Sequence, residues 1–384
     1  MAGKFPAISI TGPRQSGKTT LVKACFPHYQ YFSLEDPDIR LLAEQDPRSF
    51  LSGSEKGIIL DEVQRLPQLF SYIQGIADTN RRPGRFILTG SQNFLLLENI
   101  SQSLAGRVAI LKLLPLSITE LHHAQIKEPD YESCLLKGFY PGLFDRDIEP
   151  SDFYPHYLQT YVERDIRMLK NINDLSMFIR FVKMCAGRTG QLVNLSSLAN
   201  DSGISVPTAK SWISLLEASY IIFLLEPHYR NMTRRLVKAP KLYFTDTGLL
   251  CHLLGIKNKE QLSLHYLKGN IFENMIMGEL MKAKLNQGLE PSLTFWRDKT
   301  GHEVDCILEE GNSLMPVEIK AGRTFQEEYL KGIKYYRKLA GENLPSILIY
   351  GGNQEYTVEN VIILPYFSAG DAALRIISAR DDEE

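Results

Sequence analysis

Gly12-Pro-Arg-Gln-Ser-Gly-Lys-Thr19 decides the fold of the first part of this chain. The segment has the form G-x-x-x-x-G-K-T, follows the apolar stretch Ala7–Ile10 and precedes a helix-forming run at Thr20–Cys25. In such a loop, glycines let backbone N–H groups turn inward around a phosphate, the lysine meets the β- and γ-phosphates, and the threonine hydroxyl binds Mg²⁺. We therefore expect ATP and Mg²⁺ as ligands, with Lys18 also catalytic and Thr19 a metal ligand. The predicted ATP-binding residues are Gly12, Pro13, Arg14, Gln15, Ser16, Gly17, Lys18, Thr19 and Thr20.

An acidic pair, Asp61-Glu62, ends the apolar stretch Gly57–Leu60. Ligands of open α/β sheets bind at the carboxyl ends of the strands, so this pair is expected beside the loop. Asp61 is predicted to hold Mg²⁺, and Glu62 to polarise the water that attacks the γ-phosphate. An acidic pair after a strand is also common as a helix N-cap, but the spacing from the loop favours the catalytic interpretation.

Two further positions follow from the geometry of such a sheet. The stretch Arg85–Ser91 ends in hydroxyl groups, so Ser91 or Gln92 could bond the γ-phosphate or the water; a turn that caps the next helix is the alternative. Arg107 precedes the apolar stretch Val108–Leu111. It could reach a neighbouring subunit's nucleotide as an arginine finger, or it could be a solvated surface arginine.

Length and composition bound the remaining possibilities. With 384 residues, the chain is expected to form two or three domains. The apolar stretches in its first quarter alternate with helical segments, which predicts a parallel sheet with crossover helices. No apolar run approaches the roughly 20 residues of a membrane helix and no export signal is visible, so we expect a cytoplasmic protein without a membrane span. The five cysteines are scattered along the chain, so we expect neither a disulfide framework nor a zinc site. The net charge of −2 gives no global attraction to nucleic acid.

Several segments together resemble a known family. Gly12–Thr19, Ile59–Gln64, Leu88–Ser91 and Leu114–Glu120 look like a prokaryotic family of AAA+ ATPases whose carboxy-terminal domain is catalogued as of unknown function. The similarity continues through Tyr161–Asp165, Pro240–Gly248 and Gly269–Asn274. The resemblance implies an AAA+ module and a homo-oligomer, with a hexamer as one candidate. It also implies that Ser91 stands in the sensor position and Arg107 in the finger position.

The middle of the chain has the pattern of a helix-turn-helix with a wing. Val193–Trp212 contains a turn glycine, the capping residue Ser205 and a second helix with Thr208, Lys210 and Ser211, which is what a helix in a DNA groove would present. Basic residues nearby could contact phosphates, namely Arg234, Arg235, Lys238 and Lys241. Modules of this kind also dock proteins or build oligomers, so DNA is the favoured interpretation and not the sole one.

Three groups are expected to converge in the last part of the chain. Glu318 and Lys320 share one face of a predicted strand, and Asp305 lies on the neighbouring strand of a hairpin. Two carboxylates can bind Mg²⁺ while a lysine orients water for attack on a phosphodiester, and Glu273, on an amphipathic helix predicted over Phe272–Lys284, could add a carboxylate. The arrangement resembles the core of restriction-endonuclease-like, PD-(D/E)xK, nucleases. A cross-strand ion pair in a domain that only binds DNA or structures the oligomer is the alternative.

Together these patterns predict an α/β chain with an AAA+ P-loop ATPase domain and helical lid at residues 1–165, a winged helix-turn-helix at 166–240 and a restriction-endonuclease-like α/β domain at 241–384. The favoured function couples ATP hydrolysis to DNA binding or remodelling, including branched DNA such as Holliday junctions, with a metal-dependent nuclease as a further activity. Two other functions stay open: a nucleotide-dependent switch that binds protein partners, and an ATP-gated nuclease that acts in defence.

Overall fold

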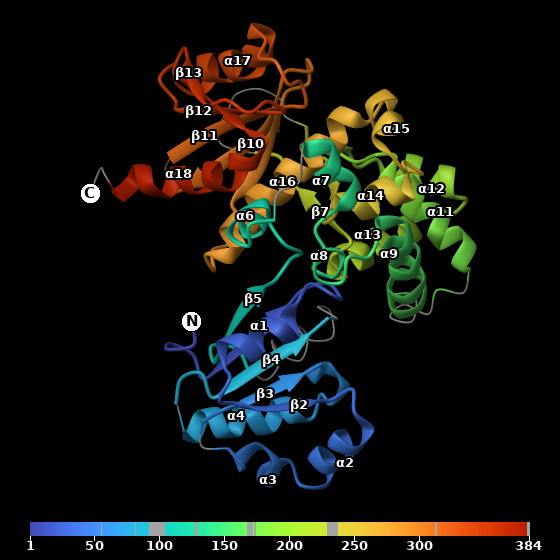
Figure 1. Cartoon of the computed structure of the whole chain (residues 1–384), viewed down its shortest axis with the longest axis vertical. Helices are drawn as coiled ribbons and strands as arrows, with labels where there is room; N and C mark the ends of the chain where they lie inside the picture. The colour runs from blue at the N-terminus through green and yellow to red at the C-terminus, as the bar shows by residue number, and fades with distance from the viewer. Residues whose placement is uncertain are drawn as a thin grey trace. The chain divides into compact units, whose positions relative to one another are not determined.

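The computed structural model describes residues 1–54, 56–80, 82–91, 104–126, 130–166, 172, 174–228, 237–311 and 313–381 (Figure 1). Gln92, Arg234 and Arg235 lie outside these residues. The chain divides into two compact units. The first comprises Met1–Pro115 with Ala218–Tyr220, and the second comprises Leu116–Glu217 with Ile221–Glu384. This division does not test whether residues 166–240 and 241–384 form separate domains, which stays a prediction.

A five-stranded sheet organises the first unit within the described ranges, in the strand order β2-β3-β4-β1-β5. Its strands are β1 (Ala7–Thr11), β2 (Gln30–Ser33), β3 (Ile58–Asp61), β4 (Phe86–Gly90) and β5 (Val108–Lys112). All of these pairings are parallel, which confirms the parallel sheet expected from the alternating apolar stretches. Because β1 lies between β4 and β5, the loop that follows it meets the carboxyl ends of several strands.

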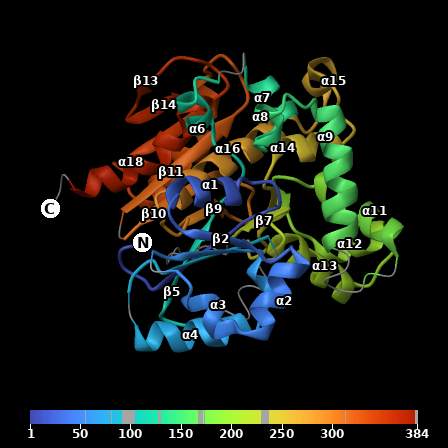
Figure 2. The same ribbon diagram turned by 60° about the horizontal axis from the view of Figure 1, so that its bottom comes forward.

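Helices cover both faces of this sheet (Figures 1 and 2). On one face, Ile58 and Leu88 pack in a core with Phe70 of α4, whereas on the other face Ile59 packs with Val22 of α1. This alternation follows from the two-residue period of a strand whose two faces are both buried. Among the described residues, the helices of this unit are α1 (Lys18–Cys25), α2 (Pro37–Gln45), α3 (Pro47–Ser52), the short η1 (Val63–Arg65) and α4 (Leu69–Thr79).

The second unit contains a mixed sheet, with the order β13-β14-β12-β11-β10-β9 in the part of the chain that the structure describes. Its strands are β9 (Leu293–Arg297), β10 (Glu303–Glu310), β11 (Ser313–Lys320), β12 (Ser346–Tyr350), β13 (Tyr356–Val358) and β14 (Val361–Pro365). β10 and β11 form the antiparallel hairpin that the sequence predicts, and β11 and β12 are parallel. Side chains of α16 (Lys268–Asn286) and α18 (Ala369–Asp381) share a core with one face of the sheet, and Ile333 and Tyr336 of α17 (Lys331–Ala340) pack on the other.

The helix predicted over Phe272–Lys284 exists, but its expected amphipathic character is wrong. α16 is buried around most of its circumference, because it packs against the sheet and also against α14 (Thr247–Leu253), α7 (Tyr131–Lys137) and α18. Two lysines near the end of this helix are also buried. Lys282 pairs with Glu279 at 2.9 Å, and Lys284 pairs with Glu310 at 2.9 Å.

The helix-turn-helix segment also forms as two helices, α12 (Leu195–Ser202) and α13 (Val206–Ala218). Gly203 ends α12 in the left-handed conformation, and the Ser205 hydroxyl accepts a hydrogen bond from the Thr208 N–H at 3.2 Å. The structure describes these further helices in the second unit: α6 (Ile118–His123), α8 (Gly142–Asp145), α9 (Pro150–Tyr157), the π-helix Leu158–Ile166, α11 (Leu175–Ala186), α15 (Lys259–Leu264), η3 (Glu327–Leu330) and η4 (Tyr366–Ser368). It also describes a small antiparallel sheet of β6 (Gln191–Leu192), β8 (Lys241–Phe244) and β7 (Ile222–Leu225).

Candidate functional site

The loop between β1 and α1 is shaped by its glycines. A Cβ at Gly12 would collide with the carbonyl oxygen of Leu113, and Gly17 begins α1 with a φ of 91°, a left-handed conformation that glycine adopts without strain. The N–H groups of the first helical turn have no carbonyl one turn back to bond, so they are donors for an anion. The loop therefore has the backbone of a phosphate site.

Lys18 is the buried cation of this loop. Its side chain is 6% exposed, and its ammonium donates to the carbonyl oxygens of Gly12 at 3.0 Å and Pro13 at 2.7 Å. Burial lowers the pKa of Lys18 to about 8, although the carboxylates of Glu62 and Asp61 act in the opposite direction. The ammonium is therefore held at a cost to stability in a position where phosphate oxygens would compensate its charge.

Asp61 is a hub of hydroxyl groups at the end of β3. Its carboxylate accepts hydrogen bonds from Thr19 at 2.8 Å, from Tyr31 at 2.7 Å and from Thr89. Burial and the bond to Asp61 raise the pKa of Tyr31. The Thr19 and Asp61 oxygens are the hard ligands that Mg²⁺ takes, and their proximity fits the predicted metal site. Tyr31 and Thr89 were not predicted; they lie on β2 and β4, the strands on either side of β3.

Glu62 adopts a left-handed backbone conformation, with a φ of 56°, directly after β3. Its Oε2 accepts a hydrogen bond from Ser91 at 3.1 Å and another from Gln64 at 2.5 Å. The structure thus brings Ser91 to the predicted base. Gln64, two residues after Glu62, was not among the residues that the sequence predicts for the site.

The other residues of the loop have lesser contacts. The Ser16 hydroxyl donates to the Pro13 carbonyl at 3.0 Å, and Arg14 lies 3.4 Å from Glu35. Gln15 is exposed and has a φ of 62°, and Thr20 is exposed in the first turn of α1. Their predicted roles in binding ATP stay predictions.

Arg107 lies at the end of the sheet where the strands begin, opposite the end that carries the phosphate loop. Its carbonyl accepts from the Ala7 N–H at the start of β1, whereas the phosphate loop follows the end of β1, so Arg107 is separated from its own chain's loop by the length of the strand. Its guanidinium makes two bonds to Asp78 of α4, at 2.5 and 3.2 Å. Asp78 raises the pKa of Arg107 through these bonds. A finger role would therefore require a neighbouring subunit and release from Asp78.

A second cluster lies on β10 and β11, where the structure brings the predicted acid and lysine side chains together. Lys320 donates to Glu318 at 2.6 Å and to Asp305 at 3.3 Å, and Asp305 also accepts from the Ile319 N–H at 2.9 Å. Burial and the neighbouring charge of Asp305 raise the pKa of Glu318 to about 8. Burial also disfavours ionised Asp305, but Lys320 and Lys241 outweigh it and lower the pKa of Asp305.

Glu273 of α16 has partners that the sequence analysis missed. Its Oε1 accepts from Lys241 at 3.0 Å and from Tyr243 at 2.5 Å, both on β8, and Lys241 also pairs with Glu303. Lys241 is 2% exposed, so the expectation that it contacts DNA phosphates is wrong. Lys241 lies more than 30 residues away in the sequence from both Glu273 and Glu303, so no local pattern predicts that they pair.

One oxygen of this cluster can accept a further ligand. Glu318 Oε2 is buried and has no hydrogen-bond partner among the described residues, and a Cβ at Gly332 of α17 would crowd it at 2.8 Å. The Asp305 and Glu318 carboxylates thus fit a divalent cation chemically, although Lys320 now bridges them. Within the described ranges, no group of three or more His, Cys, Asp and Glu side chains is arranged to hold a metal ion.

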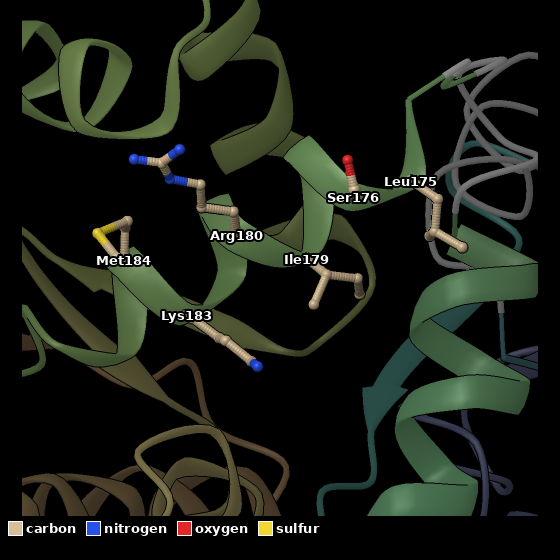
Figure 3. A pocket seen from close by; sticks show the side chains of 6 residues that line it. All are labelled: Leu175, Ser176, Ile179, Arg180, Lys183 and Met184. Atoms are coloured by element: carbon tan, nitrogen blue, oxygen red, sulfur yellow. The ribbon is translucent and has the colours of Figure 1, made fainter.

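A pocket lies along α11, and its residues are distant in the sequence from the phosphate-loop site and from the cluster on β10 and β11 (Figure 3). Its lining residues all come from this helix: Leu175, Ser176, Ile179, Arg180, Lys183 and Met184. Arg180 and Lys183, three residues apart on this helix, are exposed cations, and their charged ends point in different directions in Figure 3. On α13, Lys210 is exposed, whereas Thr208 and Ser211 are partly covered. Exposed positive charge on these helices therefore comes partly from residues outside the predicted recognition helix.

Comparison with known families separates the chain into three matched segments. A family described as an AAA domain matches residues 4–122. Two families described as domains of unknown function match residues 128–260 and 268–368. The first match contains the phosphate loop, Asp61, Glu62, Ser91 and Arg107, while the third contains Asp305, Glu318 and Lys320.

Relatives cover most of the chain. An uncharacterized protein of Mycobacterium tuberculosis is 31% identical over 327 residues, which cover 84% of this chain and 71% of that protein. An uncharacterized protein of Haemophilus influenzae is 24% identical, covering 91% of this chain and 90% of its own length. A solved Walker-type ATPase of Pyrococcus abyssi aligns with a TM-score of 0.40 and 14% identity, over 65% of this chain and 91% of that one. Among the described residues, no helix has the length and apolarity of a membrane span.

Proposed function

Because this chain belongs to a family of proteins with an AAA domain, we propose that it hydrolyses ATP with Mg²⁺ and couples hydrolysis to the binding or remodelling of DNA. One observation carries the ATPase proposal. The Thr19 hydroxyl lies 2.8 Å from the Asp61 carboxylate at the strand end that also bears Glu62, next to the buried ammonium of Lys18. This combination supplies the donors, the metal ligands and the base that phosphoryl transfer to water requires.

Each side chain has a separate task in this proposal. Lys18 leaves the Gly12 and Pro13 carbonyls and donates to β- and γ-phosphate oxygens, where its charge is compensated. Thr19 and Asp61 are the residues that would hold Mg²⁺, which supplies charge neutralisation on the phosphates. Glu62 accepts a proton from the attacking water, and Ser91 fixes the carboxylate.

The steady-state rate of ATP hydrolysis tests this function. The rate is measured with Mg²⁺ alone and with single-stranded, duplex and four-way branched DNA, with Lys18→Ala as the blank. We expect turnover that Lys18→Ala abolishes and that one DNA form stimulates. Turnover equal to that of the blank would overturn the ATPase proposal. Turnover that no DNA changes would instead favour a switch that binds protein partners.

The cluster of Asp305, Glu318 and Lys320 favours a second activity, metal-dependent hydrolysis of DNA. The supporting observation is the buried, unpartnered Glu318 Oε2 beside a lysine that touches both carboxylates. The two carboxylates would hold Mg²⁺, and Lys320 would orient the attacking water. Such a nuclease, licensed by ATP, would suit defence against foreign DNA.

Asp305→Ala and Asp371→Ala form a matched pair for this test, because Asp371 is an exposed aspartate of α18 in the same unit. We expect Mg²⁺-dependent cleavage of plasmid DNA to be lost with Asp305→Ala and kept with Asp371→Ala, while ATP turnover survives in both. Cleavage that is absent from the unaltered protein, or unchanged by Asp305→Ala, would contradict the nuclease assignment.

The homo-oligomer belongs to the same proposal. Arg107 cannot serve the loop of its own chain from the far edge of the sheet, so a finger role requires a second copy. Mixing Arg107→Ala with Lys18→Ala subunits tests it, because interfaces that join an intact loop to an intact arginine should regain part of the ATPase rate. No recovery at any mixing ratio would argue against a finger in trans.

A further inference from the structure

Gln64 has an unusual environment for a polar side chain. The residue is 7% exposed, and its Nε2 donates to Glu62 Oε2 at 2.5 Å. Its Oε1 is buried and has no hydrogen-bond partner within the described part of the chain. A primary amide offers two donors and an acceptor with two lone pairs, so this environment uses only part of its bonding capacity.

Burying an unpaired amide oxygen lowers the stability of the folded state, and an apolar side chain of similar size would avoid that cost. Packing alone therefore does not account for glutamine at this position. The one polar contact the amide makes within the described residues is with Glu62, whose backbone is held in the left-handed conformation. The chemistry of Gln64 is thus directed at the predicted catalytic base.

The contacts of Glu62 show what Gln64 does to it. Gln64 and Ser91 both donate to Oε2, one from the turn after β3 and the other from the end of β4. Two donors from different elements fix the orientation of a carboxylate, and they leave Oε1 as the oxygen available to accept from water. A carboxylate held in this way does not have to be ordered at the moment of reaction.

We propose that Gln64 is a positioning residue of the ATPase site, which acts through Glu62 to aim Oε1 at the attacking water. The inference rests on the proposed ATPase function. It predicts that loss of the amide lowers kcat while the affinity for ATP stays the same, because the phosphate contacts come from the loop and not from Gln64.

Gln64→Met tests this, because methionine nearly matches glutamine in length and lacks the amide. The control is Gln68→Met, four residues further along at an exposed position. We expect kcat to fall roughly 10- to 100-fold in Gln64→Met, with KM and the Kd for Mg·ATP within about twofold of those of the control. If this variant does not fold, Gln64→Asn, which is too short to hold Glu62, should show the same loss.

A double-mutant cycle separates positioning through Glu62 from a general structural effect. In the Glu62→Ala background, Gln64→Met should lower the remaining rate by less than about twofold. A full additional loss, an unchanged kcat or a loss confined to KM would overturn the inference while leaving the ATPase function intact. Absence of turnover in the unaltered protein would overturn the ATPase function and the inference together.

Discussion

Replacing Lys18 with methionine should make the nucleotide-free protein more stable although it destroys the ATPase. Burial lowers the pKa of Lys18 from its ordinary value of 10.5 to about 8. At about 1.4 kcal/mol for each pH unit, holding the charged form in the folded state costs roughly 3 kcal/mol. Loss of the donor to the Gly12 and Pro13 carbonyls returns about 1 kcal/mol of that, so we expect a net gain of about 2 kcal/mol in the free energy of unfolding.

The lowered pKa of Lys18 also determines how the stability of the protein depends on pH. Below about pH 8 the folded and unfolded states both hold the Lys18 proton, so the full cost is present. Between about 8 and 10.5 the unfolded state binds more protons than the folded state, and stability of the unaltered protein rises with pH. The advantage of Lys18→Met should therefore be full at pH 7 and should shrink as the pH rises through that window.

Hydrogen exchange in urea, followed in peptides from β1 and β3, is the suitable assay. Both tryptophans, Trp212 and Trp296, lie in the second unit, so fluorescence would not report on the first. Lys56→Met, at an exposed position of the first unit, is the control and should change little. Saturating Mg·ATP should reverse the order, because a ligand at 100 times its Kd stabilises only the protein that binds it, by about 2.7 kcal/mol. A Lys18→Met protein that is less stable than the unaltered one without nucleotide at pH 7 would refute the reasoning.

Three other substitutions have outcomes that the structure specifies. Asp246→Ala should lower the free energy of unfolding by about 3–5 kcal/mol in urea titrations, because it leaves the Phe139 and Leu249 N–H groups and the Tyr154 hydroxyl without their buried acceptor. Asp174→Ala removes the acceptor of an exposed helix cap and should lower it clearly less. Gly75→Ala in α4 should add about 0.5–1 kcal/mol, since a Cβ there meets nothing within 4 Å. If the second unit binds DNA, Arg180→Ala should lower the slope of log K against log salt concentration by about one phosphate contact, whereas Lys331→Ala, at an exposed control position, should leave the slope unchanged. Equal slopes for the two variants would argue against α11 as a DNA contact.

Much of the first unit could be predicted because its signals are local. The apolar stretches became strands with ends shifted by only a residue or two, such as Ile58–Asp61 for the predicted Gly57–Leu60. The spacing of Gly12, Gly17 and Lys18 reports the loop directly, because that backbone requires glycine at fixed positions. The proximity of Thr19 to Asp61 could be expected because β1 and β3 are strands of one parallel sheet, so Asp61 ends β3 at the same carboxyl edge where the loop to Thr19 begins.

The contacts that were missed depend on tertiary packing. Lys241 reaches Glu273 from a strand more than 30 residues earlier, and neither residue carries a mark of its partner in the sequence. Lys282 and Lys284 of α16 are buried, and their carboxylate partners are Glu279 on the same helix and Glu310 on β10. The bond from Arg107 to Asp78 likewise joins the start of β5 to α4, two elements that only the folded sheet brings together. Sequence patterns report which side chains are polar, but not which of them find a buried partner.

The charged groups of both candidate sites already have partners within the protein, and this determines what a ligand must displace. Asp61 has three hydroxyl partners, Lys18 has two carbonyls, and Lys320 bridges Asp305 and Glu318. A ligand therefore gains only the difference between its own contacts and those it displaces. The difference is large for Lys18, because carbonyl dipoles compensate a buried ammonium poorly and phosphate oxygens do so well. It is smaller for Asp305 and Glu318, because a divalent cation must first displace an ammonium that already touches both. The first unit should accordingly bind nucleotide more tightly than the carboxylates of β10 and β11 bind a metal ion. Its affinity should also vary less between solution conditions.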